Sequence, residues 1–297
     1  MLTSPLNIAV VGAGNIGSTF AFQLAAAGHA VTVVARPGST RLQQLQRDGA
    51  IVRADGTRAP VSVSDQLDPV IPYDVVIVTV TVHQVDAVVP ALRDSAAAHI
   101  VCMFNQFEPG SLRDRIGAAR CDFGMPFVQA SLDADGKLHA VIGAGGQKTK
   151  FGAQCWVDLF AAAGLPATFE PDMPRWLRCH VPLCVAFESI AVAGVRRDGG
   201  ASWREASTIA RGVKQSFALI EALGDPLYPA GKARLYASPW WVTAAILWSV
   251  SRITSFRTLL AQGEPECGTL VDIMVNAAQQ AGAPVDTVKI AAMKPAR

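Results

Sequence analysis

The stretch that decides the fold runs from residue 6 to residue 17 and reads LNIAVVGAGNIG. Its first half, Leu6–Val11, is an unbroken apolar run that is typical of a buried parallel strand. Its last six residues, Gly12–Gly17, fit the pattern GxGxxG, and the small-residue segment Asn15–Ala27 predicts a helix that Gly28 ends. A second apolar run, Ala30–Ala35, completes a strand–helix–strand unit, whose crossover we expect to be right-handed.

Each glycine of this pattern meets a physical requirement. Gly12 permits a tight turn, Gly14 lets a pyrophosphate approach the backbone, and Gly17 lets the helix pack closely on the sheet. The helix N-terminus adds free amides and a positive dipole. The alternative is a glycine-rich turn that only joins strand to helix, but the flanking elements favour a dinucleotide site. The predicted phosphate-binding residues are Gly12, Ala13, Gly14, Asn15, Ile16 and Gly17.

The end of the second strand selects between the two nicotinamide cofactors. An acidic residue there would accept a hydrogen bond from the ribose 2′-hydroxyl of NAD, whereas an arginine can pair with the 2′-phosphate of NADP. The sequence reads Ala35-Arg36-Pro37 at this point. Arg36 therefore favours NADP (as NADPH) over NAD, and the alternative interpretation is a solvated loop arginine.

The alternation of strands and helices continues to about residue 170 and then stops. Further strands are expected at Tyr73–Val80, His99–Phe104 and Ala167–Phe169, and further helices at Val85–Ser95, Glu108–Ile116 and Gln154–Ala163. Two hairpins are expected, one around Asp55-Gly56 and one around Asp133–Gly136, the second at an edge of the sheet. After Glu170-Pro171-Asp172-Met173-Pro174, long helices are expected at Arg175–Val195, Trp203–Leu223, Pro239–Gln262 and Glu266–Ala281.

This change of period predicts two domains. We expect an α/β, Rossmann-type doubly wound sheet in residues 1–170, which binds the dinucleotide. We expect an all-helical C-terminal domain in residues 171–297, which binds substrate and supports dimerisation. The chain has 297 residues, of which 51% are apolar, so it can bury two cores.

Composition also narrows the partners and the compartment. The net charge of +2 without a basic run gives no reason to expect nucleic-acid binding. The six cysteines form no CxxC pair and lie mostly in apolar runs, which indicates reduced thiols, a cytoplasmic protein and no metal site. No signal peptide is expected. The apolar stretches Cys179–Val195 and Ala237–Val250 are interpreted as buried helices rather than membrane spans, because the first contains Glu188 and the second is short.

At this point the sequence resembles the ketopantoate reductase family (the 2-dehydropantoate 2-reductases), over nearly the whole chain. The stretches that carry the resemblance are Val10–Gly17, Val34–Arg36, Val76–Gln84, Met103–Asn105, Ala130–Gly143, Trp176–Ala191 and Glu266–Val285. The resemblance implies reduction of a 2-oxo acid by NADPH, bound in a cleft between a Rossmann domain and a helical domain.

The resemblance also implies roles for single residues. Arg36 matches the family's 2′-phosphate ligand, and Gln84 matches a glutamine after the fourth strand. Asn105 and Glu266 match residues beside the nicotinamide and substrate, and Thr254 falls on a substrate-binding serine. The implied cofactor-binding set is completed by Val80 and Thr81, although the family has a lysine at the position of Thr81.

The departures lie in the substrate site. The family's catalytic lysine falls at Arg178, and its two substrate asparagines fall at Pro182 and Ala186. Arginine stays protonated at working pH, so it can stabilise an anion but is a poor general acid. His180 is the best available general acid, because histidine titrates near neutral pH. Residues two apart on a helix point in different directions, so only one of Arg178 and His180 is expected to reach the substrate.

Each of these residues also has a structural interpretation. His180 can be a buried interface histidine, Arg178 an ion-pair partner of Glu188 or Asp172, Glu266 a first-turn helix acid and Asn105 a strand-end cap. Glu188 must be paired or protonated if it is buried.

We expect an NADPH-dependent reductase of a 2-oxo acid or related carbonyl compound other than ketopantoate. The alternatives are an imine or opine-type reductase and a non-catalytic NADP-binding sensor. A homodimer through the apolar segment Pro239–Val250 is compatible with the sequence. In that segment Trp241 and Trp248 share one helix face, which suits packing better than a substrate pocket.

Overall fold

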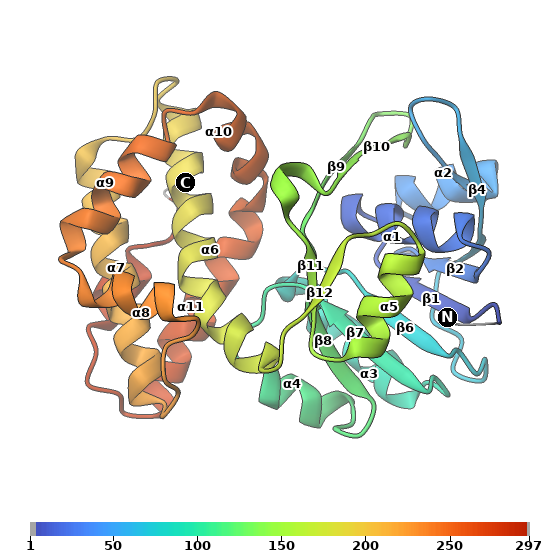
Figure 1. Ribbon diagram of the computed structural model, residues 1–297, viewed down its shortest axis with the longest axis horizontal. Coiled ribbons are helices and arrows are strands. Elements are labelled where there is room, and N and C mark those ends of the chain that lie inside the picture. Colours follow the sequence, from blue (N-terminus) through green and yellow to red (C-terminus); the bar gives the residue numbers. More distant parts are fainter. Residues whose placement is uncertain (1–3, 296–297) are drawn as a thin grey trace. The chain divides into compact units, whose positions relative to one another are not determined.

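The structure is a computed structural model that describes residues 4–295, apart from the side chains of residues 144, 262, 264 and 265. The chain forms two compact units. The N-terminal unit extends to Phe104 and resumes from Gly110 to Met173, while the C-terminal unit combines the short segment Asn105–Pro109 with the chain from Pro174 onward. Figure 1 shows the first unit in blue to green and the second mainly in yellow to red.

The N-terminal unit is built on an eight-stranded sheet with the order β12-β11-β8-β7-β6-β1-β2-β5. All neighbouring strands are parallel except β8 and β11. The strands are β1 (Asn7–Val11), β2 (Ala30–Val34), β5 (Ser62–Ser64), β6 (Val75–Val78), β7 (His99–Met103), β8 (Cys121–Met125), β11 (Thr149–Phe151) and β12 (Ala167–Phe169). The segment that opens the chain is folded as predicted, since helix α1 (Asn15–Ala26) links β1 to β2.

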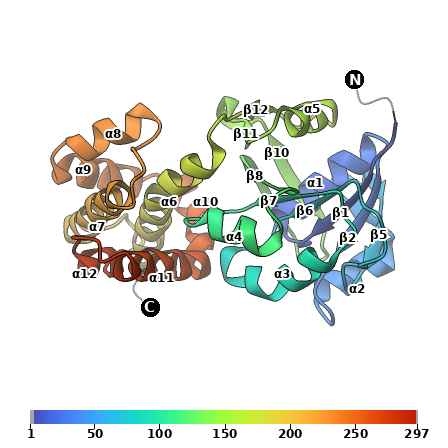
Figure 2. The same ribbon diagram turned by 90° about the horizontal axis from the view of Figure 1, so that it is seen from below.

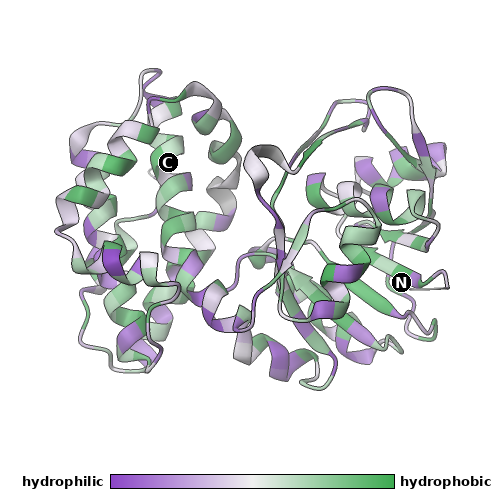
Figure 3. Ribbon diagram, viewed as in Figure 1, coloured by the Kyte–Doolittle hydropathy of each residue, from purple (hydrophilic) through white to green (hydrophobic). Residues whose placement is uncertain are grey.

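Helices cover both faces of this sheet, as Figures 1 and 2 show. They are α1, α2 (Thr40–Asp48), α3 (Val85–Asp94), α4 (Pro109–Ile116) and α5 (Gln154–Ala162). On one face, α1 and α5 meet through Phe20 and Phe160, whose ring centroids lie 4.9 Å apart, and α3 and α4 lie on the opposite face. Figure 3 shows that the central strands are apolar, as strands covered on both faces must be. The predicted doubly wound, Rossmann-type fold is therefore confirmed.

The two hairpins differ from expectation. In the first, β3 (Ala50–Val52) pairs with β4 (Arg58–Pro60), but the chain then leaves the hairpin and β5 joins the main sheet beside β2. In the second, β9 (Val128–Leu132) and β10 (Leu138–Ile142) form a separate two-stranded sheet, so its placement at an edge of the main sheet was wrong. The physical reason is that alternate apolar residues of this hairpin pack against the core around α1.

The C-terminal unit is helical, as expected, although its elements are shorter and more numerous. Its helices are α6 (Met173–Arg196), α7 (Trp203–Ala222), α8 (Ala230–Ala237), α9 (Trp240–Val250), α10 (Thr254–Leu260), α11 (Glu264–Gln280) and α12 (Thr287–Ala291). A short 3-10 turn, η3 (Ala261–Gly263), lies between α10 and α11, and the N-terminal unit has one at Val82–Gln84 (η1). The single helix predicted over 239–262 is wrong. It is divided at Ser251, whose hydroxyl donates to the carbonyl of Trp248 and accepts from the amide of Ala201.

Helix α6 is the core of the C-terminal unit. Its residues Cys179, Val185 and Ile190 are fully buried. Among residues 4–295, α6 alone is long and apolar enough to cross a bilayer by length and composition, and 56% of its apolar window is buried in the structure. A core helix of a globular protein has the same properties, so this feature is weak evidence for a membrane span.

Candidate active site

The glycine loop has the geometry that the sequence predicted for a pyrophosphate site. Gly12 has a φ of +104°, and a Cβ on Gly17 would lie 1.8 Å from the carbonyl oxygen of Gly12. By contrast, a Cβ on Gly14 would meet no atom within 4 Å, so open space lies beside the backbone where the helix begins. The residues present therefore fit a dinucleotide phosphate at the N-terminus of α1.

Three side chains that the sequence analysis did not identify hold this loop in place. The Thr79 hydroxyl donates to the Gly12 carbonyl at 2.8 Å. The Ser18 hydroxyl and Nε of Arg41 both donate to the carbonyl of Ala13, at 3.1 and 3.3 Å. These bonds hold the carbonyls of Gly12 and Ala13, and therefore the turn that precedes α1, in place.

The second hairpin is tied to the same loop. Nη1 of Arg41 donates to the Gly136 carbonyl at 2.8 Å, and the Leu132 amide donates to Oδ1 of Asn15 at 3.1 Å. Asn15 therefore serves the hairpin as well as the first turn of α1. Ile16 is partly buried and packs against the core.

Arg36 lies where the sequence analysis expected it, just beyond β2. The Gly12 amide donates to the Val34 carbonyl at 3.0 Å, so the glycine loop and the end of β2 are adjacent. The Arg36 side chain is exposed and has no hydrogen bond or ion pair with any residue in 4–295. It is therefore available to an anionic ligand.

Thr81 and Gln84 have a structural role that the sequence did not reveal. Thr81 caps the 3-10 turn η1 and forms a capping box with Gln84, whose Oε1 accepts from the Thr81 amide at 3.3 Å. The Thr81 hydroxyl also lies 3.3 Å from Nε2 of His83. Val80 lies against the glycine loop, since a Cβ on Gly12 would be 3.1 Å from its amide nitrogen.

In the C-terminal unit the structure brings Asn105 and Glu266 together. Nδ2 of Asn105 donates to Oε2 of Glu266 at 3.3 Å, across 161 residues of sequence. Asn105 is buried, and its Oδ1 has no hydrogen-bond partner among the described residues. A buried acceptor left unpaired costs stability, so this oxygen is suited to a donor on a ligand.

Arg178 acts on the segment that carries Asn105. Its Nε donates to the Phe107 carbonyl at 3.0 Å, and its Nη1 forms an ion pair with Asp225. The ion-pair interpretation of Arg178 is therefore confirmed, although Asp225 is the partner in place of Glu188 or Asp172. The guanidinium braces residues 105–109 against α6.

His180 does not suit the role of general acid that the sequence suggested. Its ring stacks on Trp176 with centroids 4.5 Å apart. Burial, helped by the positive charge of Lys232, lowers the pKa of His180 to about 3. The ring is therefore uncharged near neutral pH, so it holds no imidazolium proton to give.

Thr254 stands apart from the Asn105–Glu266 pair. It begins helix α10 with its side chain exposed. Its hydroxyl accepts from Nη2 of Arg257 at 3.3 Å. No described contact joins it to Asn105.

Glu188 is the buried acid of α6. It is 9% exposed, and no cation pairs with it within residues 4–295. The Cys267 thiol donates to Oε2 at 2.9 Å and the Cys184 thiol to Oε1 at 3.3 Å. Burial raises the pKa of Glu188 from 4.5 to about 7; the thiols oppose this shift and the negative charge of Glu266 adds to it.

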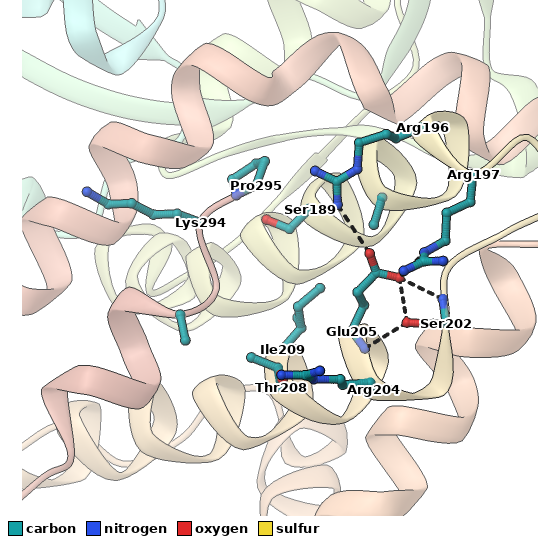
Figure 4. Close-up of a pocket in the computed structure, with 12 residues that line it drawn as sticks. Ser189, Arg196, Arg197, Ser202, Arg204, Glu205, Thr208, Ile209, Lys294 and Pro295 are labelled. Atoms are coloured by element: carbon teal, nitrogen blue, oxygen red, sulfur yellow. Dashed lines mark hydrogen bonds and ion pairs between the residues drawn. The ribbon is translucent and has the colours of Figure 1, made fainter. Parts of the chain in front are cut away.

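A pocket of about 310 Å³ also lies in the C-terminal unit, between α6, α7 and the end of the described chain (Figure 4). At its centre Glu205 accepts hydrogen bonds from Arg196 and Arg197 and forms the capping box of α7 with Ser202. Burial would raise the pKa of Glu205, but these bonds lower it to about 2. The pocket contains none of the predicted site residues, and its central charges are paired with each other.

The part of the chain that the structure describes contains no group of three His, Cys, Asp or Glu side chains suited to a metal ion. All six cysteines are free.

Comparison with known proteins identifies relatives of this chain. Residues 8–154 match the family model described as ketopantoate reductase PanE/ApbA. A 2-dehydropantoate 2-reductase of Vibrio cholerae serotype O1 is 28% identical over 182 residues, which are 58% of this chain and 58% of the relative. The matched part thus spans less than two thirds of that relative's length.

Solved structures share the fold over almost the full chain. A PanE/ApbA family ketopantoate reductase from Ralstonia eutropha JMP134 matches with a TM-score of 0.73 at 21% identity, covering 96% of both chains. A D-mandelate dehydrogenase in complex with NADH also matches with a TM-score of 0.73, at 15% identity, covering 97% of this chain and 96% of the other. At these identities the likeness shows the fold alone.

The glycine loop gives a matched pair of variants. We expect Gly17→Ala to lower the free energy of unfolding by about 2–3 kcal/mol, because its Cβ would collide with the Gly12 carbonyl. We expect Gly14→Ala to retain the wild-type stability and to weaken cofactor binding by about tenfold, because the methyl group fills the space beside the backbone. Urea denaturation and cofactor fluorescence titration measure the two effects. Equal losses of stability in both variants would contradict this distinction.

The buried Glu188 makes stability depend on pH. Its folded pKa of about 7 exceeds its ordinary value of 4.5, so the folded protein binds more protons than the unfolded chain between these values. Stability is therefore expected to fall as pH rises from about 5 to about 7.5, by on the order of 3 kcal/mol. Glu188→Gln should remove this fall in urea denaturation. Glu170→Gln, which changes a buried acid paired with Lys150, should retain it. An identical fall in Glu188→Gln would show that another group titrates.

Proposed function

We propose that this chain, whose residues 8–154 match the ketopantoate reductase family model, is an NADPH-dependent oxidoreductase that reduces a 2-oxo acid or related carbonyl compound to the hydroxy compound. The observation that carries this proposal is the coexistence of a glycine loop open at Gly14 with the hydrogen bond between the buried Asn105 and the half-buried Glu266. Fold and family alone would leave the activity open. The roles given below to single residues are parts of the same proposal.

The choice of NADPH rests on Arg36. An exposed guanidinium without a protein partner, next to the end of β2, suits a 2′-phosphate. The family has a lysine, a second cation for the 2′-phosphate, at the position of Thr81. The preference for NADPH over NADH should therefore be smaller than in an enzyme that has both the arginine and the lysine. The D-mandelate dehydrogenase neighbour was solved with NADH, which makes NADH the second cofactor to test.

The chemistry divides between the cofactor and the chain. The bound cofactor supplies a hydride to the carbonyl carbon. Glu266 and Asn105 act on the oxygen side: Glu266 is the ionisable group of the pair, and Oδ1 of Asn105 accepts a hydrogen bond from the substrate or cofactor. Arg178 is a positioning residue, because it holds residues 105–109 and its charge is neutralised by Asp225.

The substrate is expected to be less polar than ketopantoate. Pro182 and Ala186 occupy the two positions where the resemblance calls for asparagines, and neither side chain can form a hydrogen bond. The D-mandelate dehydrogenase neighbour carries an activity on an aromatic hydroxy acid, so aromatic 2-oxo acids belong in the substrate panel. An imine or opine-type reductase and a non-catalytic NADP-binding sensor remain the alternatives.

We also propose a cytoplasmic homodimer with a small-molecule carbonyl substrate. The six free cysteines agree with a reducing compartment. Trp241 and Ile246 of α9 are 54% and 42% exposed, an unusual exposure for large apolar residues on neighbouring turns. Sedimentation velocity should give a dimer that Trp241→Glu dissociates. A wild-type monomer at micromolar concentration would exclude this assembly.

The activity is tested by following nicotinamide absorbance with NADPH and NADH against aliphatic and aromatic 2-oxo acids, ketopantoate included. We expect turnover of at least one acid, with NADPH preferred. Binding of NADPH without turnover of any 2-oxo acid or imine would favour the sensor. No binding of either cofactor would reject the proposal.

The same assay tests Arg36. Arg36→Ala should reduce kcat/KM for NADPH by about tenfold and leave that for NADH nearly unchanged, because only NADPH carries the 2′-phosphate. Arg58→Ala, an exposed arginine of the same unit outside the glycine loop, is the matched control. An unchanged cofactor preference would show that Arg36 is a solvated loop residue.

A further inference from the structure

Helix α2 presents a row of hydrogen-bond donors to the turn of the second hairpin. Arg41, Gln44 and Arg47 follow one another at intervals of three residues, so they form a ridge along the helix. The carbonyls of three successive turn residues accept hydrogen bonds from this row, at 2.9 Å for Ala134, 3.3 Å for Asp135 and 2.8 Å for Gly136. The turn is therefore attached to α2 along its whole length.

Arg41 is the member of this row that also reaches the glycine loop. Its Nη1 donates to the Gly136 carbonyl, while its Nε donates to the Ala13 carbonyl at 3.3 Å and its Nη2 to the Ser18 hydroxyl at 3.1 Å. Gly136 is buried, and a Cβ on it would lie 2.6 Å from Nη1 of Arg41. One guanidinium thus joins the hairpin turn, the glycine loop and α1, all within the N-terminal unit.

The charge of Arg41 is not balanced by a bonded acid. Its hydrogen bonds go to two carbonyls, a hydroxyl and an amide oxygen, and within residues 4–295 it forms no ion pair with a carboxylate. Asp48 is the acid whose charge acts on it, but Arg47 already holds both oxygens of Asp48, at 2.8 and 2.9 Å. Burial lowers the pKa of Arg41, because a partly buried guanidinium loses hydration.

A positive charge at this place favours an anion on the glycine loop. The N-terminus of α1 carries the positive end of the helix dipole, and Arg41 bonds the turn that precedes it through Ala13. Both act more strongly on an anion where bound ligand has displaced water. The anion that a loop of this pattern accommodates is a pyrophosphate.

We propose that Arg41 is a positioning residue of the cofactor site, which holds the glycine loop and the β9–β10 hairpin together and whose charge is balanced by the cofactor pyrophosphate. Binding of the pyrophosphate therefore tightens the attachment of the hairpin. This inference rests on the proposed function, because it takes the ligand of the loop to be a dinucleotide. Arg41 acts through the loop and its charge, so it is distinct from Arg36, which is assigned to the 2′-phosphate.

The first experiment measures Kd for NADPH and NADH by fluorescence titration. Arg41→Gln should raise both values by the same factor, about tenfold, because the two cofactors share the pyrophosphate. Arg47→Gln is the matched control, since it weakens the same turn without touching the glycine loop, and it should leave both values within about twofold of the wild type. Unchanged affinities in Arg41→Gln, or a loss for NADPH alone, overturn the proposal.

The second experiment measures hydrogen exchange of the hairpin, Val128–Ile142, without any turnover. ADP-ribose is the probe, because it has the pyrophosphate and lacks both the nicotinamide and the 2′-phosphate. At saturation it should slow exchange of the hairpin by about fivefold in the wild type and in Arg47→Gln, but not in Arg41→Gln. A merely structural role of Arg41 would speed exchange in Arg41→Gln and retain the slowing by ADP-ribose. Slowing of the wild-type size in Arg41→Gln therefore overturns the coupling.

A third variant separates charge from folding. Arg41→Lys keeps the positive charge but cannot make all the bonds of the guanidinium, so its Kd for ADP-ribose should lie about threefold above the wild type and below that of Arg41→Gln. Circular dichroism and the urea midpoint establish that each variant is folded. Equal affinities of Arg41→Lys and Arg41→Gln contradict the role of the charge.

The outcomes also separate this inference from the proposed function. A wild type that binds ADP-ribose but turns over no carbonyl compound rejects the reductase, while slower hairpin exchange that depends on Arg41 still supports the inference. A wild type that binds no dinucleotide overturns both.

Discussion

The contact between Gly17 and the carbonyl of Gly12 fixes the N-terminal unit. At this point α1 lies so close to the turn after β1 that the backbone carbonyl occupies the place of a side chain. Thr79, just beyond β6, closes on the same carbonyl, so the neighbouring strand is tied to the turn as well. The open space at Gly14 exists because the loop is held on its other sides by Thr79, Ser18 and Arg41. A cofactor site of this kind is a property of the backbone, and side chains serve to keep that backbone in place.

Much of the fold of the N-terminal unit could be predicted because the residues that form it give local signals. The glycine pattern predicts the turn and the start of α1, and each apolar run beside it predicts one strand with its ends. Strand β8 was missed because Cys121–Met125 contains Asp122 and Gly124 and has no continuous apolar run. Gly124 is required there by the close approach of Met103 and Lys150, which the local sequence does not encode. The second hairpin was recognised, but its partner was not, because pairing with α1 depends on contacts more than 100 residues away.

The candidate site was harder to predict for the same reason. Asn105 and Glu266 were identified through the resemblance to a family, since no spacing rule joins residues 161 apart. Helix periodicity predicted that Arg178 and His180 point in different directions, but it did not predict how deeply either side chain is buried. Burial decides the outcome for His180, because a desolvated ring beside Lys232 does not hold a proton at neutral pH. The capping role of Thr81 was also missed, although Thr81 and Gln84 of its capping box are only three positions apart in the sequence.

The charges of the C-terminal unit follow a consistent physical logic. An arginine does not release its proton at working pH, so we assign Arg178 a structural role. Its guanidinium pairs with Asp225 and donates to the Phe107 carbonyl, and the second bond holds the segment that carries Asn105. Proton transfer then requires a group whose pKa lies near working pH. Burial raises the pKa of a carboxyl group toward that range, whereas it lowers the pKa of a histidine and moves it away from that range. Burial therefore has opposite effects on two residues of α6: it lowers the pKa of His180 to about 3 and raises the pKa of Glu188 to about 7.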